Sequence, residues 1–259
     1  MTFCAIVLPW RCEPRGYFRR EKMIITIDGP VASGKSSVAK TLARELNIYY
    51  LYTGLLYRAV AYIFLTELKN KQKYKDEVIT NEVFESNFKV LDSEGLSWIK
   101  KICYDYGKNE AENRPYIFYN DQDITQNLYD GSLDQLASIV SVNKNVREFL
   151  LDLQRDIGKR YDIVADGRDC GSVVFPDADY KFYLTAKSGV RAQRLMLDET
   201  RGKTEKDLSK VKEELEQRDK RDSEREVAPL TIPENAIVID NSNLTLEETI
   251  DKFLERLSG

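Results

Sequence analysis

Residues 29–36 of this chain read GPVASGKS and match the pattern G-x-x-x-x-G-K-[ST] at every fixed position. A run of β-forming side chains at residues 23–28 precedes them, and a helical pattern of Val38, Leu42 and Leu46 follows. A strand, a glycine-rich turn and a helix N-terminus in this order are the setting of a phosphate-binding loop. A chance glycine turn is the alternative, and the flanking strand and helix argue against it. The match therefore predicts a strand–loop–helix unit that binds phosphate.

The residue types of this loop suit phosphate for physical reasons. Gly29 and Gly34 let the backbone turn tightly and approach phosphate oxygens, and the dipole of the following helix favours negative charge. Lys35 is expected to bridge the β- and γ-phosphates of ATP, and the Ser36 hydroxyl to ligate Mg²⁺. The residues predicted to surround the triphosphate are Gly29, Pro30, Val31, Ala32, Ser33, Gly34, Lys35, Ser36 and Ser37.

The chain contains no histidine among its 259 residues. Ser-His-Asp and Cys-His mechanisms, an imidazole general base and a His-ligated zinc site are therefore excluded. The chemistry must depend on carboxylates, lysine, arginine, hydroxyls, main-chain amides or a bound cation. The formal net charge of −4 does not indicate a nucleic-acid-binding protein, because such domains are usually basic.

Cysteine spacing and hydropathy favour a cytoplasmic protein. The four cysteines form no C-x-x-C pair and are typical of reduced thiols. No convincing targeting segment precedes the β run at 23–28. Residues 46–66 are long enough to cross a bilayer, but Arg58 interrupts them, and we interpret them as a buried strand, turn and helix. We expect a cytoplasmic monomer with no membrane partner and no nucleic-acid partner.

Strand-like and helix-like segments alternate along the chain from Met23 onward. The predicted strands are residues 23–28, 49–52, 163–165, 180–184 and 236–239, and the predicted helices are 36–46, 55–68, 133–160, 188–199, 204–225 and 245–257. This alternation predicts an α/β fold with a parallel, five-stranded, doubly wound sheet flanked by helices. Thr245 and Glu248 have the spacing of a capping box at the start of the last helix.

Two stretches do not follow this alternation. Residues 70–132 are rich in Asn, Asp, Lys and Tyr, and their strand-like pieces at 88–91 and 116–119 predict a small β-rich insertion. Residues 1–22 show no hydrophobic period and are interrupted by proline and glycine. We expect the domain to span residues 23–259, and the first 22 residues to be an extension that is disordered or not native.

A carboxylate follows the predicted strand at residues 163–165. Asp166 at this place could orient the water shell of Mg²⁺, and the alternative is that it only caps the turn before Gly167. Ligands of open α/β sheets bind at the carboxyl ends of the strands. Arg168 therefore suits a phosphate group there, and Asp169 suits a ribose hydroxyl.

The helix predicted at residues 204–225 ends in a cluster of charges. Arg218, Asp222 and Arg225 share one face at offsets of four and three, and Arg221 lies beside them. A solvated helix with i,i+4 ion pairs accounts for most of the segment. At its end, however, the arginines precede an apolar Val-Ala-Pro-Leu stretch that should return to the core, so they can point into a cleft. Cations there would stabilise the charge that develops during phosphoryl transfer.

Four further motifs occur along the chain: YTGLLYR at 52–58, ADGRD at 165–169, VVFPDA at 173–178 and RDKRD at 218–222. Together with the glycine-rich loop they resemble bacterial-type cytidylate kinases, over residues from about Met23 to Leu257. The resemblance implies a P-loop kinase fold in which the insertion binds the acceptor and a helical lid at about 191–204 closes. It also implies transfer of the γ-phosphoryl group of ATP to CMP or dCMP with Mg²⁺ as cofactor.

The resemblance also implies roles for individual residues. The residues implied in catalysis are Lys35, Arg168, Arg218 and Arg221. Arg191 and Arg194 lie where the lid begins, and the resemblance implies that they contact ATP. The residues implied in binding CMP are Thr53, Tyr57, Arg58, Ser138, Arg147, Arg168, Asp169, Arg218, Asp222 and Arg225. Residues 128–132 depart from the family pattern, because they contain Asp130 where the family has an Ile-Arg-Thr-like stretch.

Two other functions stay open. Another P-loop kinase, acting on UMP, shikimate or dephospho-coenzyme A, would share the loop but not the face formed by Arg218, Asp222 and Arg225. A non-catalytic nucleotide-binding switch would bind GTP through an Asn-Lys-x-Asp motif after a strand. Residues 143–145 read Asn-Lys-Asn in a predicted helix, which makes the switch the weaker alternative. The sequence does not distinguish among CMP, dCMP and UMP as acceptors.

Overall fold

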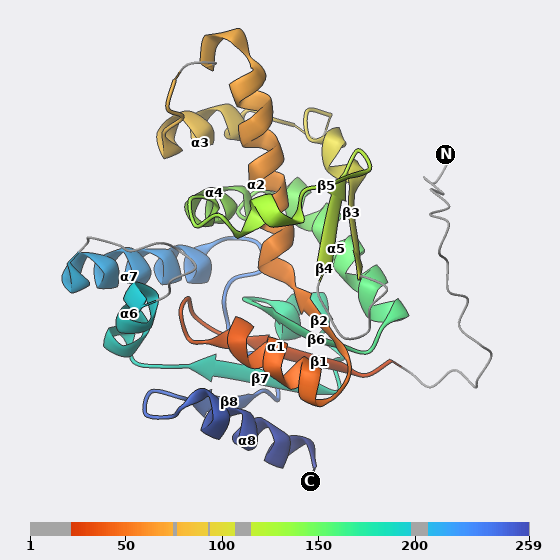
Figure 1. The fold of residues 1–259 in the computed structure, drawn as a ribbon, viewed down its shortest axis with the longest axis vertical. Helices are drawn as coiled ribbons and strands as arrows, with labels where there is room; N and C mark the ends of the chain where they lie inside the picture. Colours follow the sequence, from red (N-terminus) through yellow and green to blue (C-terminus); the bar gives the residue numbers. More distant parts are fainter. Residues whose placement is uncertain (1–21, 75–76, 93, 107–114, 198–206, 259) are drawn as a thin grey trace.

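A five-stranded sheet lies at the centre of the computed structural model, which describes residues 22–74, 77–92, 94–106, 115–197 and 207–258 (Figure 1). Its strands lie in the order β2-β6-β1-β7-β8, and every neighbouring pair is parallel. Their bounds are Ile24–Asp28 for β1, Tyr49–Tyr52 for β2, Ile163–Gly167 for β6, Tyr180–Thr185 for β7 and Ile237–Asp240 for β8. The predicted parallel sheet is confirmed.

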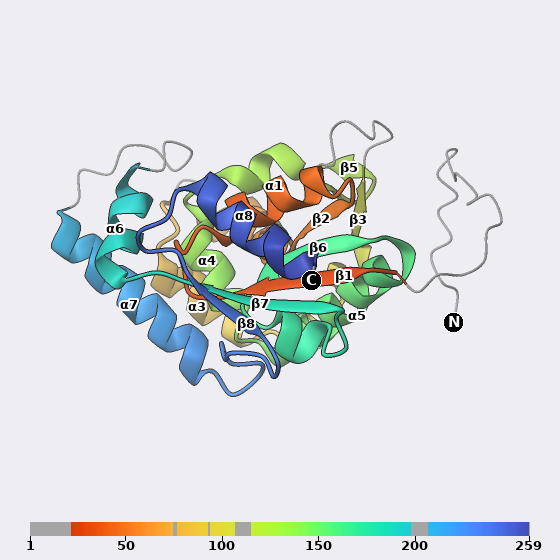
Figure 2. The same cartoon turned by 90° about the horizontal axis from the view of Figure 1, so that it is seen from below.

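Helices cover both faces of this sheet (Figure 2). On one face, α1 (Lys35–Glu45) and α8 (Leu246–Leu257) bury their apolar sides against β1 and β7. On the other face, α2 (Thr53–Asn70) and α5 (Lys144–Arg160) form a larger core with residues of β2 and β6. Within the described residues, no helix is both long and apolar enough to span a membrane.

The strand β1 shows why both faces are covered. Ile25 and Ile27 are fully buried in the core that α1 and α8 complete. Thr26 and Asp28 are also fully buried and point to the opposite face, where a Cβ added at Gly171 would lie 2.7 Å and 3.2 Å from their side-chain oxygens. A parallel strand buried on both faces has to place its polar side chains in protein rather than in water. Strand β1 therefore ends in a buried carboxyl group, that of Asp28.

The last helix begins as the sequence predicts. The Thr245 hydroxyl accepts a hydrogen bond from the Glu248 amide at 3.1 Å, and the Glu248 carboxylate accepts one from the Thr245 amide at 2.8 Å. Two main-chain donors at the helix N-terminus are thus satisfied reciprocally, as in a capping box. The Phe253 ring of this helix packs on Phe182 of β7, with ring centroids 4.3 Å apart.

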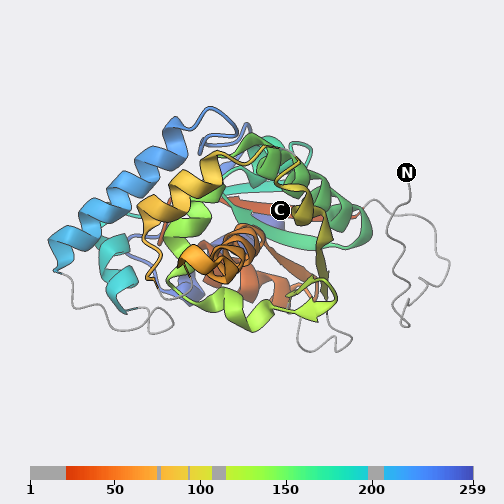
Figure 3. The same ribbon diagram turned by 90° about the horizontal axis from the view of Figure 1, so that it is seen from above.

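The segment expected to be a β-rich insertion contains a second sheet and helices. Strands β3 (Ile102–Tyr106), β4 (Pro115–Tyr119) and β5 (Gln122–Asp123) pair antiparallel in that order. The prediction of a strand at residues 116–119 is confirmed. Viewed from above, α2 is seen almost end-on with the helices of this segment beside it (Figure 3). The insertion also contacts the edge strand β2, where the Tyr104 hydroxyl of β3 donates to the Tyr50 carbonyl at 3.3 Å.

The strand predicted at residues 88–91 is wrong, because Phe88 lies in helix α3 (Asn81–Lys89). The Thr80 side chain caps this helix, and Phe84 and Phe88 are one turn apart on its buried side. Both rings meet Phe64 of α2, at centroid distances of 5.1 Å and 5.0 Å. The helical spacing of Phe84 and Phe88 therefore outweighs the strand-like composition of residues 88–91.

The single helix predicted at residues 133–160 is two helices. After α4 (Leu133–Val140) the chain breaks, and α5 begins at Lys144 with Asn143 as its N-cap, accepting from the Val146 amide at 3.2 Å. Asparagine is a strong N-cap because its side chain bonds a main-chain amide that the helix leaves free. The break brings the end of α4 and the start of α5 together, so that Arg147 donates to the Ser141 carbonyl at 3.2 Å.

Helices α6 (Ser188–Leu197) and α7 (Leu208–Glu224) pack against each other beside the carboxyl end of the sheet (Figure 1). They correspond to the helices predicted at 188–199 and 204–225. The lid expected at about 191–204 overlaps α6 up to Leu197, and its remaining residues lie outside the described part of the chain. The extension expected at residues 1–22 likewise lies outside it, apart from Lys22.

Candidate active site

The glycine-rich loop connects β1 to α1, as its sequence requires. Gly29 has φ 148°, and a Cβ there would lie 2.1 Å from the carbonyl oxygen of Leu184 in β7. Gly34, the N-cap residue of α1, is left-handed with φ 91°. Both conformations favour glycine, the first also because the neighbouring strand leaves no room for a side chain. The two fixed glycines of the motif are therefore explained by backbone geometry.

The Lys35 ammonium is buried within this loop. It donates to the Pro30 carbonyl at 2.6 Å and to the Ser33 hydroxyl at 3.3 Å. Burial lowers the pKa of Lys35 well below its ordinary value, and the positive charge of Arg168 acts in the same direction. The carboxylates of Asp166 and Asp219 oppose this effect. A negatively charged ligand at the loop would therefore stabilise the ammonium form.

Asp166 joins the loop to the end of β6. Its carboxylate accepts hydrogen bonds from the Ser36 hydroxyl at 2.7 Å and from the Tyr50 hydroxyl at 2.9 Å. Burial raises the pKa of Asp166, and the bonds from Ser36 and Tyr50 together with the charge of Lys35 act against that. The carboxylate therefore faces the first turn of α1, directly after the phosphate-binding loop.

Ser36 and Asp166 fit a magnesium ion by the chemistry of their donor atoms. Mg²⁺ prefers oxygen ligands and in nucleotide sites uses one or two protein groups together with phosphate oxygens and water. A hydroxyl and a carboxylate oxygen 2.7 Å apart at the N-terminus of α1 meet that requirement. Within the described residues there is no cluster of three or more His, Cys, Asp or Glu side chains able to hold a metal without a ligand's help.

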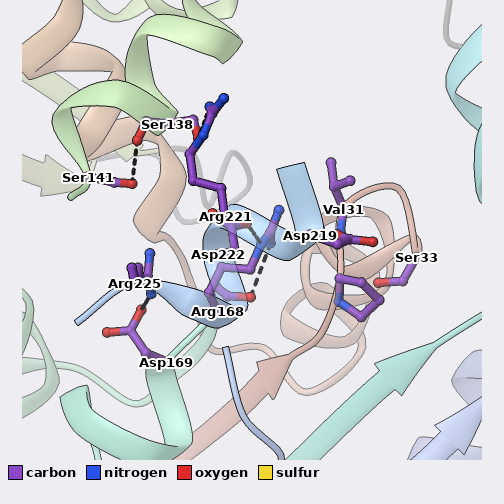
Figure 4. Close-up of polar contacts among 12 residues, drawn as sticks. Val31, Ser33, Ser138, Ser141, Arg168, Asp169, Asp219, Arg221, Asp222 and Arg225 are labelled. Carbon is purple, nitrogen blue, oxygen red and sulfur yellow. Dashed lines mark hydrogen bonds and ion pairs between the residues drawn. The ribbon is translucent and has the colours of Figure 1, made fainter. Parts of the chain in front are cut away.

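The turn after β6 carries charges that face α7 (Figure 4). Arg168 donates from Nε to the Asp222 carboxylate at 2.9 Å. Asp169 forms ion pairs with Arg147 of α5 and with Arg225, whose Nη2 lies 3.2 Å from the Asp169 carboxylate. Although burial acts to raise the pKa of Asp222, the positive charges of Arg168, Arg218 and Arg225 hold that pKa below its ordinary value. The structure thus brings together the predicted charges of the turn and of the helix.

Residues at the α4–α5 junction meet α7 on its other side. The Arg221 Nη1 donates to the Ser138 hydroxyl at 3.1 Å, and the Ser138 carbonyl accepts from Ser141 (Figure 4). The Arg147 guanidinium also lies over the Tyr57 ring, 5.6 Å from its centroid. Burial raises the pKa of the Tyr57 hydroxyl far above its ordinary value, so the hydroxyl stays neutral.

The first two turns of α2 contribute two predicted residues, Thr53 and Arg58, with different surroundings. The Thr53 hydroxyl donates to the Asp166 carbonyl at 2.7 Å and so lies beside the turn after β6. Arg58, which the resemblance implies in binding CMP, is buried and forms an ion pair with Asp134 of α4. Its second nitrogen donates to the Leu128 carbonyl at 2.9 Å. In this conformation Arg58 therefore connects α2 to the stretch 128–132, where the sequence departs from the family pattern.

Arg191 and Arg194 of α6 contact the glycine-rich loop. Arg191 donates to the Val31 carbonyl at 3.0 Å, and Arg194 to the Ser33 carbonyl at 3.4 Å. Asn241, after β8, reinforces this contact, because its amide donates to the Ser33 carbonyl at 3.0 Å and its oxygen accepts from Arg194 at 2.9 Å. The two arginines expected near ATP thus lie beside the loop.

Sequence reasoning missed three polar residues of this region: Asp28, Asp219 and Asn241. The Asp28 carboxylate accepts from the amides of Cys170 and Gly171, both at 2.7 Å, and ties the turn after β6 to the start of the loop. Burial raises the pKa of Asp28 to about 7, although the two amides act to lower it. Its place at the end of β1, directly before Gly29, is the only signal in the sequence that could have identified it.

The chain is similar in sequence to known proteins over most of its length. The family model described as cytidylate kinase matches residues 25–258. A cytidylate kinase of Bacillus cereus (strain G9842) is 34% identical over 92% of this chain and 97% of its own length. One of Thermodesulfovibrio yellowstonii is 37% identical over 92% of this chain and 98% of its own. Among solved structures, a shikimate kinase from Bacteroides thetaiotaomicron is 11% identical with a TM-score of 0.46, over 92% of this chain and 99% of that one.

Proposed function

The chain belongs to the cytidylate kinase family, and from this premise we propose that it transfers the γ-phosphoryl group of ATP to CMP or dCMP, producing ADP and CDP or dCDP. The observation that carries the proposal is the carboxyl end of β6 together with the turn that follows it. Asp166, in the strand, contacts Ser36 of the phosphate-binding loop, whereas Arg168 and Asp169 of the turn contact the charges of α5 and α7. Residues 166–169 would therefore join a donor side to a second anion-binding side.

We assign the donor side to ATP. The main-chain amides at the start of α1 and the Lys35 ammonium would bind the β- and γ-phosphates, because both present positive charge to the loop. Arg191 and Arg194 would approach the same phosphates from α6. Ser36, with Asp166 acting through water, would hold Mg²⁺, which supplies neutralisation of phosphate charge when it is bound.

We assign the acceptor side to a pyrimidine nucleoside monophosphate. Arg168 would bind its phosphate, since a guanidinium forms paired hydrogen bonds with phosphate oxygens. Asp222 and Asp169 would accept from the sugar hydroxyls, and Ser138 would meet the base. The residues that complete this proposed site are Thr53, Tyr57, Arg58, Arg147, Arg218 and Arg225.

The proposed chemistry needs no general base, and this agrees with a chain that lacks histidine. The second pKa of a phosphate monoester is about 6, so the acceptor oxygen is largely ionised at neutral pH. This oxygen attacks the γ-phosphorus in line, and the bond from that phosphorus to the β–γ bridging oxygen breaks as ADP leaves. Lys35, Arg168, Arg218 and Arg221 would stabilise the charge of the transition state.

A coupled assay of ADP release tests the proposal with CMP, dCMP, UMP, AMP and shikimate as acceptors. We expect CMP and dCMP to give the highest kcat/KM. In the variant Lys35→Ala, kcat should fall by about 10²-fold or more, because one positive group at the transferred phosphate is lost. Lys40→Ala, on the exposed side of the same helix, is the matched control and should leave the rate unchanged. A higher kcat/KM for shikimate or AMP than for CMP would refute the assignment.

A further inference from the structure

Asp219 of α7 reaches across to the phosphate-binding loop (Figure 4). One of its carboxylate oxygens accepts a hydrogen bond from the Val31 amide at 3.0 Å. The other accepts from Nη1 of Arg191 at 2.5 Å, and the same nitrogen donates to the Val31 carbonyl at 3.0 Å. A carboxylate from a residue 188 positions later in the chain thus bonds a main-chain amide inside the loop.

The surroundings of this carboxylate are those expected for a phosphate. A loop amide and a guanidinium donate to it, and its negative charge acts to raise the pKa of Lys35. Amide, guanidinium and ammonium are the three kinds of group that bind phosphate oxygens in nucleotide sites. The side chain is mostly buried, at 18% exposure, so solvent screens these interactions only in part.

Asp219 shares its helix with residues of the acceptor side. Asp222 lies three positions further on and holds Arg168, and Arg221 bonds Ser138. Because α7 is one continuous helix, a contact that fixes Asp219 also restricts where Asp222 and Arg221 can lie. The donor loop and the acceptor side are therefore mechanically connected through a single helix.

We propose that Asp219 is an internal anion of the phosphate-binding loop, which occupies the Val31 amide and Arg191 until a nucleoside triphosphate replaces it. When the Asp219 carboxylate leaves the loop, α7 can shift and reposition Arg221 and Asp222. Binding of the nucleoside triphosphate therefore strengthens binding of the acceptor. The inference rests on the proposed use of a triphosphate donor at this loop. A carboxylate and the γ-phosphate repel each other and compete for the same donors, so the two cannot occupy this place together.

The opposite role for the same contact makes a different prediction. If Asp219 served only to hold Arg191 in place for the nucleotide, removing its charge would weaken nucleotide binding. If Asp219 is a competing anion, removing its charge strengthens nucleotide binding, because the loop no longer has to release the carboxylate before it can bind the nucleotide. The sign of the change in affinity therefore separates the two roles.

The experiment measures the dissociation constant of magnesium AMP-PNP by calorimetry in the absence of acceptor. Asp219→Asn keeps the shape of the side chain and removes its charge, and we expect it to bind AMP-PNP about three- to tenfold more tightly than the wild type. Glu216→Gln removes the same charge from an exposed position one turn earlier on α7 and should leave the affinity unchanged. Unchanged or weaker binding by Asp219→Asn overturns the proposal.

A second measurement tests the connection to the acceptor. In the wild type, saturating AMP-PNP should tighten CMP binding, and in Asp219→Asn most of that gain should already be present without AMP-PNP. An equal gain in both proteins would overturn the coupling. Asp219→Ser serves in the same way if the asparagine variant does not fold. Failure of the wild type to bind AMP-PNP at all would instead contradict the proposed function, so the two failures can be told apart.

Discussion

Asp28 is a carboxyl group with no solvent exposure that accepts from two main-chain amides of the turn after β6. Burial raises its pKa to about 7, and the negative charge of Asp169 acts in the same direction. The chain has no histidine, so few other side chains change protonation near neutral pH. The protonation of Asp28 should therefore be visible in the stability of the whole protein.

We expect the contribution of Asp28 to the free energy of unfolding to fall as the pH rises from about 4 to 7. Over this range the folded chain keeps a proton on Asp28 that the unfolded chain, with an ordinary carboxyl pKa, has released. One such group contributes a slope of about 1.4 kcal/mol per pH unit, which disappears above the folded-state pKa.

Urea denaturation at several pH values between about 5 and 8 measures this slope. Asp28→Asn should flatten the profile, and Asp177→Asn, at an exposed position, should not. Burial raises the pKa of Asp166 as well, so part of the slope should remain in the Asp28 variant. Parallel profiles for the wild type and Asp28→Asn would show that Asp28 does not titrate in this range.

At the scale of elements, α3 shows how a local pattern is decided by a tertiary partner. Phe84 and Phe88 fit both a helix and a short strand when the sequence alone is considered, since each is an aromatic residue in a polar stretch. The Thr80 cap and the ring of Phe64 in α2 favour the helix, because both phenylalanines then face the same core. This contact joins the insertion to the central domain.

Phe88→Ala should lower the free energy of unfolding by about 3–5 kcal/mol, the usual cost of removing a fully enclosed ring. Phe88 is 2% exposed and touches both Phe64 and Phe84, so the cavity left behind would lie in the core of the insertion. Val90→Ala is the matched control, because Val90 is 78% exposed and should change stability little. Thermal and urea unfolding check both variants, and equal stability of the two would contradict the packing described here.

At the scale of the whole molecule, α7 connects parts of the chain that are far apart in sequence. It contacts the phosphate-binding loop through Asp219, the turn after β6 through Asp222, and the end of α4 through Arg221. These contacts bring the phosphate-binding loop, the turn after β6 and the end of α4 together around one helix at the carboxyl edge of the central sheet. In parallel α/β sheets this edge is where ligands bind.

Asp222→Ala should raise the KM for CMP by about tenfold or more and change the KM for ATP much less. The variant removes the carboxylate that holds Arg168 and leaves that mostly buried guanidinium without a carboxylate partner on α7. Glu224→Gln, two residues later and exposed, is the control for lost charge on α7. Steady-state kinetics with each substrate varied in turn measures both constants. A rise in the KM for ATP alone would mean that Asp222 belongs to the donor side.

Local patterns in the sequence were sufficient for the central fold and for the donor loop. The loop at residues 29–36 is one contiguous stretch, and its glycine conformations and its position between β1 and α1 depend mainly on neighbours in the chain. The parallel strands were predictable because alternation of strand and helix permits few arrangements. The capping box of Thr245 and Glu248 is local in the same sense.

Only the tertiary structure decided which charged groups meet. Asp28 bonds amides more than 140 residues away, and Asp219 bonds an amide 188 residues away, so no spacing in the sequence could reveal either contact. The sequence predicts that the arginines at the end of α7 point into a cleft, but it does not show which groups they meet there. The partner of a charged side chain is set by how distant elements pack, because burial turns a weak surface interaction into a strong one. The sequence by itself predicted the phosphate-binding loop at residues 29–36. The packing of α7 decided how that loop is connected to the turn after β6.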